Sequence, residues 1–563
     1  MMRSIVLSIV FIAVPVTLAL EYAPDYAFTE VPDPLSGNNP RYPLVPLAEP
    51  DPGVEYFEPS FGTILFKATT RDYSHSRHEY SRLDPFNVDQ SRILLDPSDG
   101  WDVYSTASIP FNTTANLVIQ PSLSEPRWDP SNANLLWGFS DFSIVTLDVT
   151  TGDLTIIVDF TQDPIIGPLI ASSNVYRITC KDEGEPSVDM RYWGLMLQGD
   201  VQEDYEPLYV FCWDRLTAST LGVRTLQENE RLIDWVGMSW HGNYLLIGSD
   251  YNNGGPLAGL VMATRDLTQF HRLDYATAHS DVGLDAQGRE VIVMQNINTD
   301  FIDMIPIDFT TQPILEAGGS YEGTNRTPLI RLFYDFGSPY GLQSGVHVSC
   351  NHAGYAVVST YIQPFLPEKN WLDRSIVLVT LDDAAARVVY LAKTPNTTAE
   401  YWEETHASIT RDGSRVVWAE NWGIDPGVVD MFLMSLRMPQ GGGGLVDIEL
   451  EMPATAFGEG DPCGLTLGMQ NPGGMMTADL YVLLDVAGQF FSYPAWQAIG
   501  NGLSHETISI PAGVSSKTII PDFIMPAVSP FGPMHFYAAL FTPGLLGIDA
   551  LISDVATFDF SLN

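Results

Sequence analysis

The chain has 563 residues and a formal net charge of −42, because 69 Asp and Glu stand against only 27 Lys and Arg. A surface of this sign repels phosphate backbones and anionic headgroups, which argues against nucleic acid and anionic membranes as partners. Hydrophobic residues make up 45% of the chain, and 46 Gly, 40 Pro and 11% aromatic residues favour many short strands and tight turns over helices.

The beginning of the chain has the pattern of a secretory signal. An apolar stretch follows Arg3 and ends at Leu20. We therefore predict a signal peptide over 1–20, an extracytoplasmic protein after its removal, and no transmembrane segment in the mature chain. Residues 21–58 are rich in Pro and acidic residues, which predicts an extended linker.

A repeated cassette begins after this linker. A turn rich in Gly, Asp or Asn is followed by a short apolar run, and this pattern recurs at intervals of about 40–60 residues. The clearest runs are Arg92–Leu95, Asn134–Trp137, Tyr244–Ile247, Glu290–Val293, Tyr355–Val358 and Arg415–Trp418. Such recurrence is typical of stacked β-units, and at this length it predicts a seven-bladed β-propeller over 59–439.

The last cassette tests this interpretation, because it contains only three strands before a run of glycines at 441–444. A propeller blade needs four strands, and an unpaired outer edge is prone to aggregate. The strand Gly62–Ala68 has no other partner near it in the sequence. We therefore expect it to lie beside Val429–Arg437 and to close the ring.

Residues 445–563 follow the glycine linker at 440–444 and alternate apolar and polar positions between clusters of Pro and Gly. This spacing predicts a second all-β domain, a C-terminal β-sandwich. It resembles the Ig-like sandwiches appended to exported bacterial proteins, a resemblance of fold that implies no activity. The four cysteines are expected to be unpaired and mostly buried.

Three successive repeats carry a histidine shortly before the turn: His279, His347 and His406. In a propeller the first strand of each blade lines the channel, so equivalent positions in neighbouring blades face one another. Three neutral imidazoles that meet there predict a site for a first-row divalent ion. The alternative is a structural role, in which each ring bonds a backbone carbonyl. The candidate carboxylates for fixing the ring tautomers are Asp281, Glu403 and Glu404.

The stretch His406–Gly413, a histidine ahead of an Asp-Gly turn, resembles the repeat of TolB-like propellers. Its spread over successive blades is similar to the oligogalacturonate lyase family, which are seven-bladed propellers that cleave uronides by β-elimination. That family holds a manganese ion with three His and one Gln. The resemblance implies that the three histidines are metal ligands, with manganese or calcium as the candidate ion, and it places Ser344 where the family has its Gln.

Two kinds of side chain are candidates for substrate binding. Trp235 and Trp402 are placed where aromatic rings could stack on sugars at a channel rim. Arg326 and Arg331 lie in a long insertion of the fifth repeat and could pair with carboxylates. For the tryptophans the alternative is core packing, and for the arginines it is a solvated surface.

These observations leave three functions open and identify no catalytic residue. The first is an exported binding or surface-interaction protein that recognises carbohydrate or another cell-surface partner at the channel mouth. The second is a metal-dependent polysaccharide lyase acting on uronides. The third is a structural component of the cell envelope.

Overall fold

The structure is a computed structural model and describes residues 28–563, apart from 37–38, 71–74, 98–99, 250–252, 276, 297–298, 300, 311–324, 333–343, 363–369, 384–385, 398–399, 424–427, 437–445, 472–475, 512, 528, 542–552 and 554. The described residues form two compact units, one ending at 437 and one beginning at 438. The predicted signal peptide, 1–20, and the glycine linker, 440–444, lie outside the described residues.

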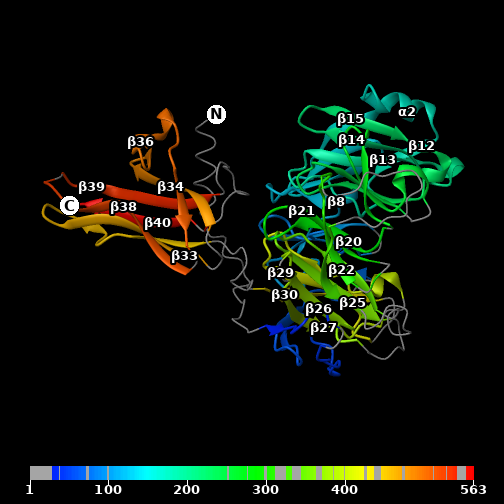
Figure 1. Cartoon of the computed structure of the whole chain (residues 1–563), viewed down its shortest axis with the longest axis horizontal. Coiled ribbons are helices and arrows are strands. Elements are labelled where there is room, and N and C mark those ends of the chain that lie inside the picture. Colours follow the sequence, from blue (N-terminus) through cyan, green and yellow to red (C-terminus); the bar gives the residue numbers. More distant parts are fainter. Residues whose placement is uncertain are drawn as a thin grey trace. The chain divides into compact units, whose positions relative to one another are not determined.

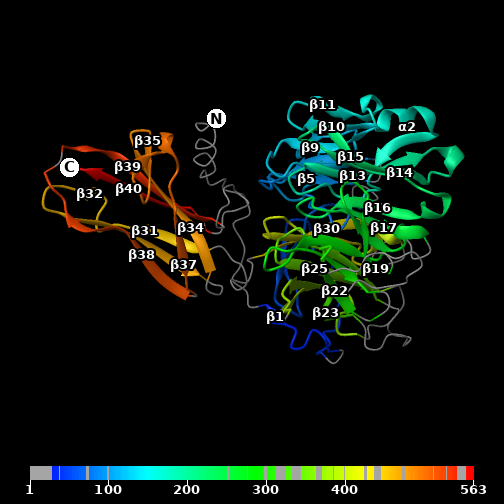
Figure 2. The ribbon, with the colours of Figure 1, turned by 45° about the horizontal axis from the view of Figure 1, so that its top comes forward.

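Seven sheets follow one another along the first unit, and Figures 1 and 2 show them as short bundles of arrows. Sheet 1 contains β5 (Arg92–Leu95), β6 (Asp102–Ser105) and β7 (Leu117–Ile119). Sheet 2 contains β8 (Ser124–Trp128), β9 (Leu135–Ser140), β10 (Ser143–Asp148) and β11 (Leu154–Asp159). Sheet 3 contains β12 (Val175–Thr179), β13 (Tyr192–Gly199), β14 (Pro207–Asp214) and β15 (Ser219–Thr225).

The next sheets repeat this antiparallel order. Sheet 4 contains β16 (Ile233–Met238), β17 (Leu245–Ser249), β18 (Leu260–Ala263) and β19 (Phe270–Asp274). Sheet 5 contains β20 (Ser280–Leu284), β21 (Glu290–Gln295), β22 (Phe301–Pro306) and β23 (Thr327–Arg331). Sheet 6 contains β24 (Ser344–Ser349), β25 (Tyr355–Ile362), β26 (Ser375–Thr380) and β27 (Val388–Lys393), with β1 (Thr29–Glu30) on its outer edge.

Sheet 7 joins the two ends of this unit. It contains β28 (Ser408–Ile409), β29 (Arg415–Glu420), β30 (Val429–Ser435), β3 (Ile64–Lys67) and β2 (Glu55–Phe57), and the short β4 (His75–Ser76) pairs with β30. The antiparallel register of β3 on β30 sets Leu65 opposite Met434 and Lys67 opposite Phe432. The predicted pairing of the N-terminal strand with the last strand of the repeat is therefore confirmed.

Apolar side chains fill the spaces between consecutive sheets. Buried clusters join sheet 1 to 2, 2 to 3, 3 to 4, 4 to 5, and 5 to 6. A further cluster packs Val417 and Leu433 of sheet 7 against Ile93 and Tyr104 of sheet 1. Because the last sheet packs on the first, the arrangement closes on itself. The fold is thus a propeller-type all-β fold, as the cassette predicts, and each of the six quoted runs lies largely within a strand.

The segment predicted as an extended linker is held against the propeller. Its strands β1 and β2 pair with sheets 6 and 7. In addition, the backbone N–H of Arg331 donates to the Pro34 carbonyl, and Nε1 of Trp422 donates to the Leu47 carbonyl.

The described residues contain few helical turns: α2 (Ile166–Ser172), η1 (Phe160–Gln162), η2 (Val201–Glu203), η3 (Glu228–Glu230), η4 (Gly255–Leu257), η5 (Tyr401–Glu403) and η6 (Ile499–Asn501). Within the described part of the chain, no helix has the length and apolarity to span a bilayer.

The second unit consists of two sheets around one core. One sheet contains β31 (Asp447–Glu451), β33 (Pro462–Asn471) and β38 (Gly513–Ile524). The other contains β32 (Ala456–Phe457), β34 (Met476–Val486), β35 (Gln489–Ser492), β36 (Gln497–Ala498), β37 (Glu506–Ile510), β39 (Phe531–Phe541) and β40 (Ala556–Leu562). Leu465 and Leu467 from the first pack with Leu480 and Phe536 from the second, so the unit is a β-sandwich. All four cysteines are free and buried, as expected.

Candidate metal centre

The three histidines of the repeat lie together at the inner strands of sheets 5, 6 and 7. His347 is on β24, His279 directly precedes β20, and His406 lies two residues before β28. The ring centroids of His279 and His347 are 4.4 Å apart, and those of His347 and His406 are 3.9 Å apart. The structure therefore brings the predicted imidazoles into contact, while their role as metal ligands stays a prediction.

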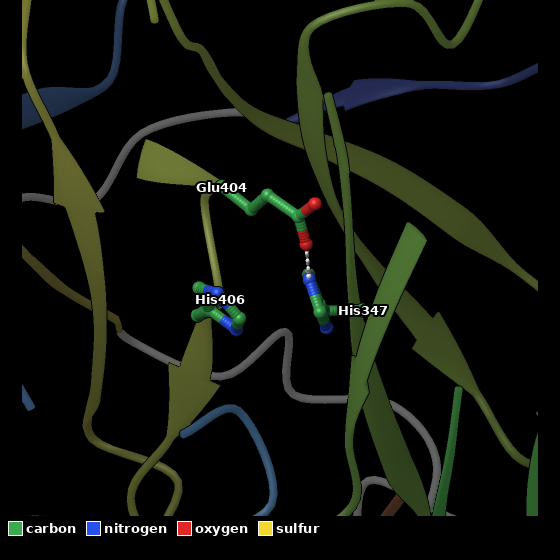
Figure 3. Close-up of side chains that lie close together, drawn as sticks. All are labelled: His347, Glu404 and His406. Atoms are coloured by element: carbon green, nitrogen blue, oxygen red, sulfur yellow. Dashed lines mark hydrogen bonds and ion pairs between the residues drawn. The ribbon is translucent and has the colours of Figure 1, made fainter. Parts of the chain in front are cut away.

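A carboxylate completes this group (Figure 3). Glu404 follows η5, and its Oε2 atom lies 2.7 Å from Nε2 of His347. His347, Glu404 and His406 each offer one ligand atom, and these atoms all lie within 4.8 Å of one another. No other group of three His, Cys, Asp or Glu with this spacing occurs in the part of the chain that the structure describes. The donor set suits a first-row divalent ion.

Hydrogen bonds fix the tautomers of two of the rings. Nε2 of His347 faces the Glu404 carboxylate, and Nε2 of His406 lies 3.1 Å from the Tyr401 carbonyl oxygen. The Tyr401 carbonyl is an acceptor, and so is the Glu404 carboxylate in its ionised form. With these partners each neutral imidazole carries its proton on Nε2 and keeps a lone pair on Nδ1. Both Nδ1 atoms are buried, and among the described residues neither has a hydrogen-bond partner. Two such lone pairs on neighbouring rings are the groups that a metal ion binds.

Burial sets the charge of the site. It lowers the pKa of His347 and of His406 well below the usual range, with like charges nearby as a lesser cause. Burial, followed by the Arg82 guanidinium, lowers the pKa of His279 to about 4. Burial also raises the pKa of Glu404 to about 7. The three imidazoles are therefore neutral at pH 7, which is the form that binds metal.

The backbone at His406 is held in an uncommon conformation. Its φ angle is 44°, in the left-handed region that costs a non-glycine residue of order 1 kcal/mol. Nε2 of His78 donates to the His406 carbonyl over 2.6 Å, and the next N–H, of Ala407, donates to Oγ of Ser359. These hydrogen bonds thus stabilise a strained backbone conformation, in which the imidazole of His406 lies beside that of His347.

A tyrosine lies between the three rings. The hydroxyl of Tyr80 lies 3.2 Å from Nδ1 of His279. The centroid of its ring is 5.4 Å from that of His347 and 5.1 Å from that of His406. Burial raises the pKa of Tyr80, so the phenol is neutral and has an O–H to donate. Tyr80 belongs to the irregular inner segment of sheet 1, which is joined to β5 by isolated bridges at Arg77 and Phe86.

Trp402 is the predicted substrate-binding residue that stays next to the cluster. The residue is 39% exposed, and its ring centroid lies 6.0 Å from that of His406. The Arg77 guanidinium lies 3.7 Å from the centroid of the Trp402 ring. Tyr401, beside it on η5, is 42% exposed. Two partly exposed aromatic rings therefore adjoin the buried histidines.

Trp235 is buried and is only 2% exposed. Its Nε1 donates to Oγ1 of Thr277 over 3.3 Å, and the Arg82 guanidinium lies 4.5 Å from its ring centroid. Trp235 and Arg82 line a cavity of about 30 Å³ that also borders Asp281. The side chain thus packs within the channel and has little surface for a sugar.

The two arginines lie away from the histidines. Arg326 forms ion pairs with Asp274 and Asp303, whose side chains are 0% and 2% exposed. Arg331 is on β23, which is three strands outward from β20 in sheet 5, and its guanidinium lies 5.9 Å from the Phe301 ring. Of the four residues predicted to bind substrate, only Trp402 thus adjoins the candidate metal centre.

Of the nearby carboxylates, Glu404 contacts a histidine as expected. Glu403 forms a capping box with Glu400 at η5, and Asp281 accepts the backbone N–H groups of Cys350 and Val282. Sequence reasoning did not find His78 or Tyr80, because sheet 1 lacks the histidine of the later repeats. The one available signal was the position of Tyr80 shortly before the first run of the repeat, Arg92–Leu95.

Comparisons with known proteins assign no family. The sequence matches no protein family, and no curated protein matches it. A solved structure of oligogalacturonate lyase in complex with manganese is similar at 12% identity and a TM-score of 0.43, over 72% of this chain and 99% of that chain. A putative TolB from Agrobacterium tumefaciens is similar at 13% identity and a TM-score of 0.26, over 44% of this chain and 81% of that chain.

A TolB from Acinetobacter baumannii is similar at 15% identity and a TM-score of 0.24, over 56% of this chain and 63% of that chain. At these values the similarities carry no argument about activity, substrate or metal. The propeller-type fold rests instead on the sheet order and packing described above.

Proposed function

We propose that this chain is an extracytoplasmic, seven-bladed propeller protein that binds a divalent first-row metal ion in its channel. His347 and His406 would hold the ion through Nδ1, and Glu404 would fix the tautomer of His347. The observation that carries the proposal is the pair of buried Nδ1 atoms described above, which have no hydrogen-bond partner among the described residues. Leaving such acceptors without a partner costs free energy unless a ligand binds them.

The donor set also favours one class of ion. Neutral imidazole nitrogens suit manganese and the later first-row metals, whereas calcium is bound almost entirely by oxygen. The net charge of −42 raises the local concentration of any divalent cation near the surface. When bound, the ion would supply a Lewis acid that attracts carboxylates and polarises carbonyl groups.

We further propose that the bound ion recognises an acidic carbohydrate. Trp402 and Tyr401 present partly exposed rings next to His406. Aromatic rings stack on the apolar faces of sugars, and a cation beside them would attract the carboxylate of a uronic acid. A glycan-binding protein of the cell exterior is the function that this combination supports best.

Metal analysis of the purified protein tests the proposal. One equivalent of a first-row metal is expected in the wild type after exchange into manganese or zinc, and less than a tenth of this in His347→Ala. The matched control is His241→Ala, because His241 is exposed and remote from the cluster in the sequence. Urea unfolding midpoints must show that both variants fold. A wild type that binds no metal at micromolar concentration would overturn the proposal.

The same exposed rings and cation favour a second function, the cleavage of uronides by β-elimination. Elimination needs a cation to acidify the proton next to the carboxylate and a base to remove it. An absorbance assay for the unsaturated product decides between the two. Product from pectic or alginate oligomers, lost in His347→Ala, identifies a lyase. Glycan binding without product identifies a binding protein. If the protein neither binds glycans nor forms product, the structural role in the cell envelope is favoured.

A further inference from the structure

A cavity at the outer edges of sheets 6 and 7 shares no lining residue with the candidate metal centre. Its volume is about 250 Å³, and it lies between the N-terminal segment 44–59 and residues that follow or end strands of these sheets. A smaller apolar cavity, of about 150 Å³, can already hold benzene in a protein. Most of the wall is apolar or aromatic, and it includes Leu44, Leu47, Pro59, Pro395, Tyr56 and Trp422.

Two buried side chains of opposite charge also line this cavity. Glu58 is 3% exposed and Lys393 is 4% exposed. The backbone N–H groups of Ser60 and Phe61 donate to Oε2 of Glu58 over 2.8 and 2.6 Å. Nζ of Lys393 donates to the Asp373 carbonyl over 2.6 Å. These hydrogen bonds fix one carboxylate and one ammonium group in a wall that is otherwise apolar.

The two charges interact with each other. Burial raises the pKa of the Glu58 carboxyl, while hydrogen bonds from the backbone and the positive charge of Lys393 oppose this rise. A buried charge is costly unless an opposite charge accompanies it. A ligand with a single charge would therefore compete with one member of this pair and leave the other uncompensated. A ligand with both an ammonium and a carboxylate group offers each member a partner.

We infer that this cavity binds a free amino acid with a large apolar side chain. The ammonium group of the ligand pairs with Glu58, and its carboxylate pairs with Lys393. Its side chain lies against the rings of Tyr56 and Trp422, whose centroids are 5.6 Å apart and whose planes meet at 82°. This site is independent of the metal ion proposed for the channel.

Calorimetric titration of the full wild-type chain tests the inference with four probes. L-phenylalanine and L-leucine carry both charges, phenethylamine lacks the carboxylate, and 3-phenylpropionate lacks the ammonium group. We expect phenethylamine and 3-phenylpropionate to bind about 10–100-fold more weakly than phenylalanine, as is typical for the loss of a hydrogen bond to a charged group. Equal affinity for either of these two probes, or no binding of both amino acids at millimolar concentration, would overturn the inference.

A substitution tests the role of the carboxylate. Glu58→Gln keeps an oxygen that can accept the two backbone N–H groups and removes the charge, so phenylalanine should bind about 10–100-fold more weakly. The matched control is Glu55→Gln, because Glu55 is exposed on β2 and is not among the residues that line the cavity. Unchanged affinity for phenylalanine in Glu58→Gln would contradict the inference. Urea midpoints show whether both variants fold, and the four probes on the wild type decide the question if one does not.

Discussion

The closure of the ring depends in part on a buried ion pair that can be tested. Nζ of Lys67 on β3 lies 2.7 Å from Oδ2 of Asp430 on β30, and the two side chains are 7% and 0% exposed. Lys67 also contacts Glu49 at 2.6 Å. The substitution Lys67→Met keeps the aliphatic length of the side chain and removes the charge that faces Asp430.

The expected cost follows from the burial of the pair. Removing one partner of a buried ion pair destabilises a protein by about 3–5 kcal/mol, because the remaining charge has lost its counterion. At an m-value of about 4 kcal/mol per M for a unit of this size, the urea midpoint should fall by about 1 M. The control is Arg387→Met, because Arg387 pairs with Glu30 at an exposed edge, where a salt bridge contributes about 0–1 kcal/mol.

Tryptophan fluorescence is the appropriate readout, since Trp496 is the only one of the twelve tryptophans that lies in the second unit. Unfolding followed in this way reports on the propeller. A midpoint for Lys67→Met within 0.2 M (roughly the uncertainty of the extrapolation) of that for Arg387→Met would refute the reasoning that this pair fastens the ring. In that case the apolar contacts of β3 would suffice for closure.

Two further predictions concern buried polar groups. Burial lowers the pKa of His78 to about 4, below the value of about 6.5 expected when unfolded. The unfolded state therefore binds more protons between these values, so stability should fall by up to about 3 kcal/mol as the pH drops from 6.5 to 4. His78→Gln keeps a hydrogen-bond donor for the His406 carbonyl, and its urea midpoint should depend less on pH than that of the wild type. The same dependence on pH in both proteins would contradict the assignment of this effect to His78. Arg326→Met removes the cation that contacts Asp274 and Asp303 and should cost about 3–5 kcal/mol in urea unfolding without changing zinc affinity. Weaker zinc binding at unchanged stability would show that Arg326 acts at the site.

Much of the propeller fold was predictable because the sequence pattern that indicates it is local and recurs along the chain. The cassette marks where a turn is followed by a buried strand, and the structure has strands at each quoted run. The expected partner of β3 also followed from the count of strands in the last repeat, since a propeller blade without its fourth strand would expose an edge. The convergence of the three histidines followed from their common position in the repeat.

The residues that complete the site were not predictable in the same way. Glu404 was expected near the rings, but its contact with His347 depends on the path of η5 and the left-handed backbone of His406. Tyr80 reaches the histidines from a segment with no regular strand, so no periodicity marks it.

The order of the strands, the closing partner and the meeting of the imidazoles were predictable, because each follows from a repeat whose spacing is visible along the chain. The polar groups that face these rings, and the candidate residues that turn away from them, depend instead on tertiary packing. Trp235 and Arg326 are directed into buried contacts by neighbours far along the chain, at Arg82 and Asp274. Contacts of that kind depend on how sheets pack together, and a single sequence carries no periodic signal for them.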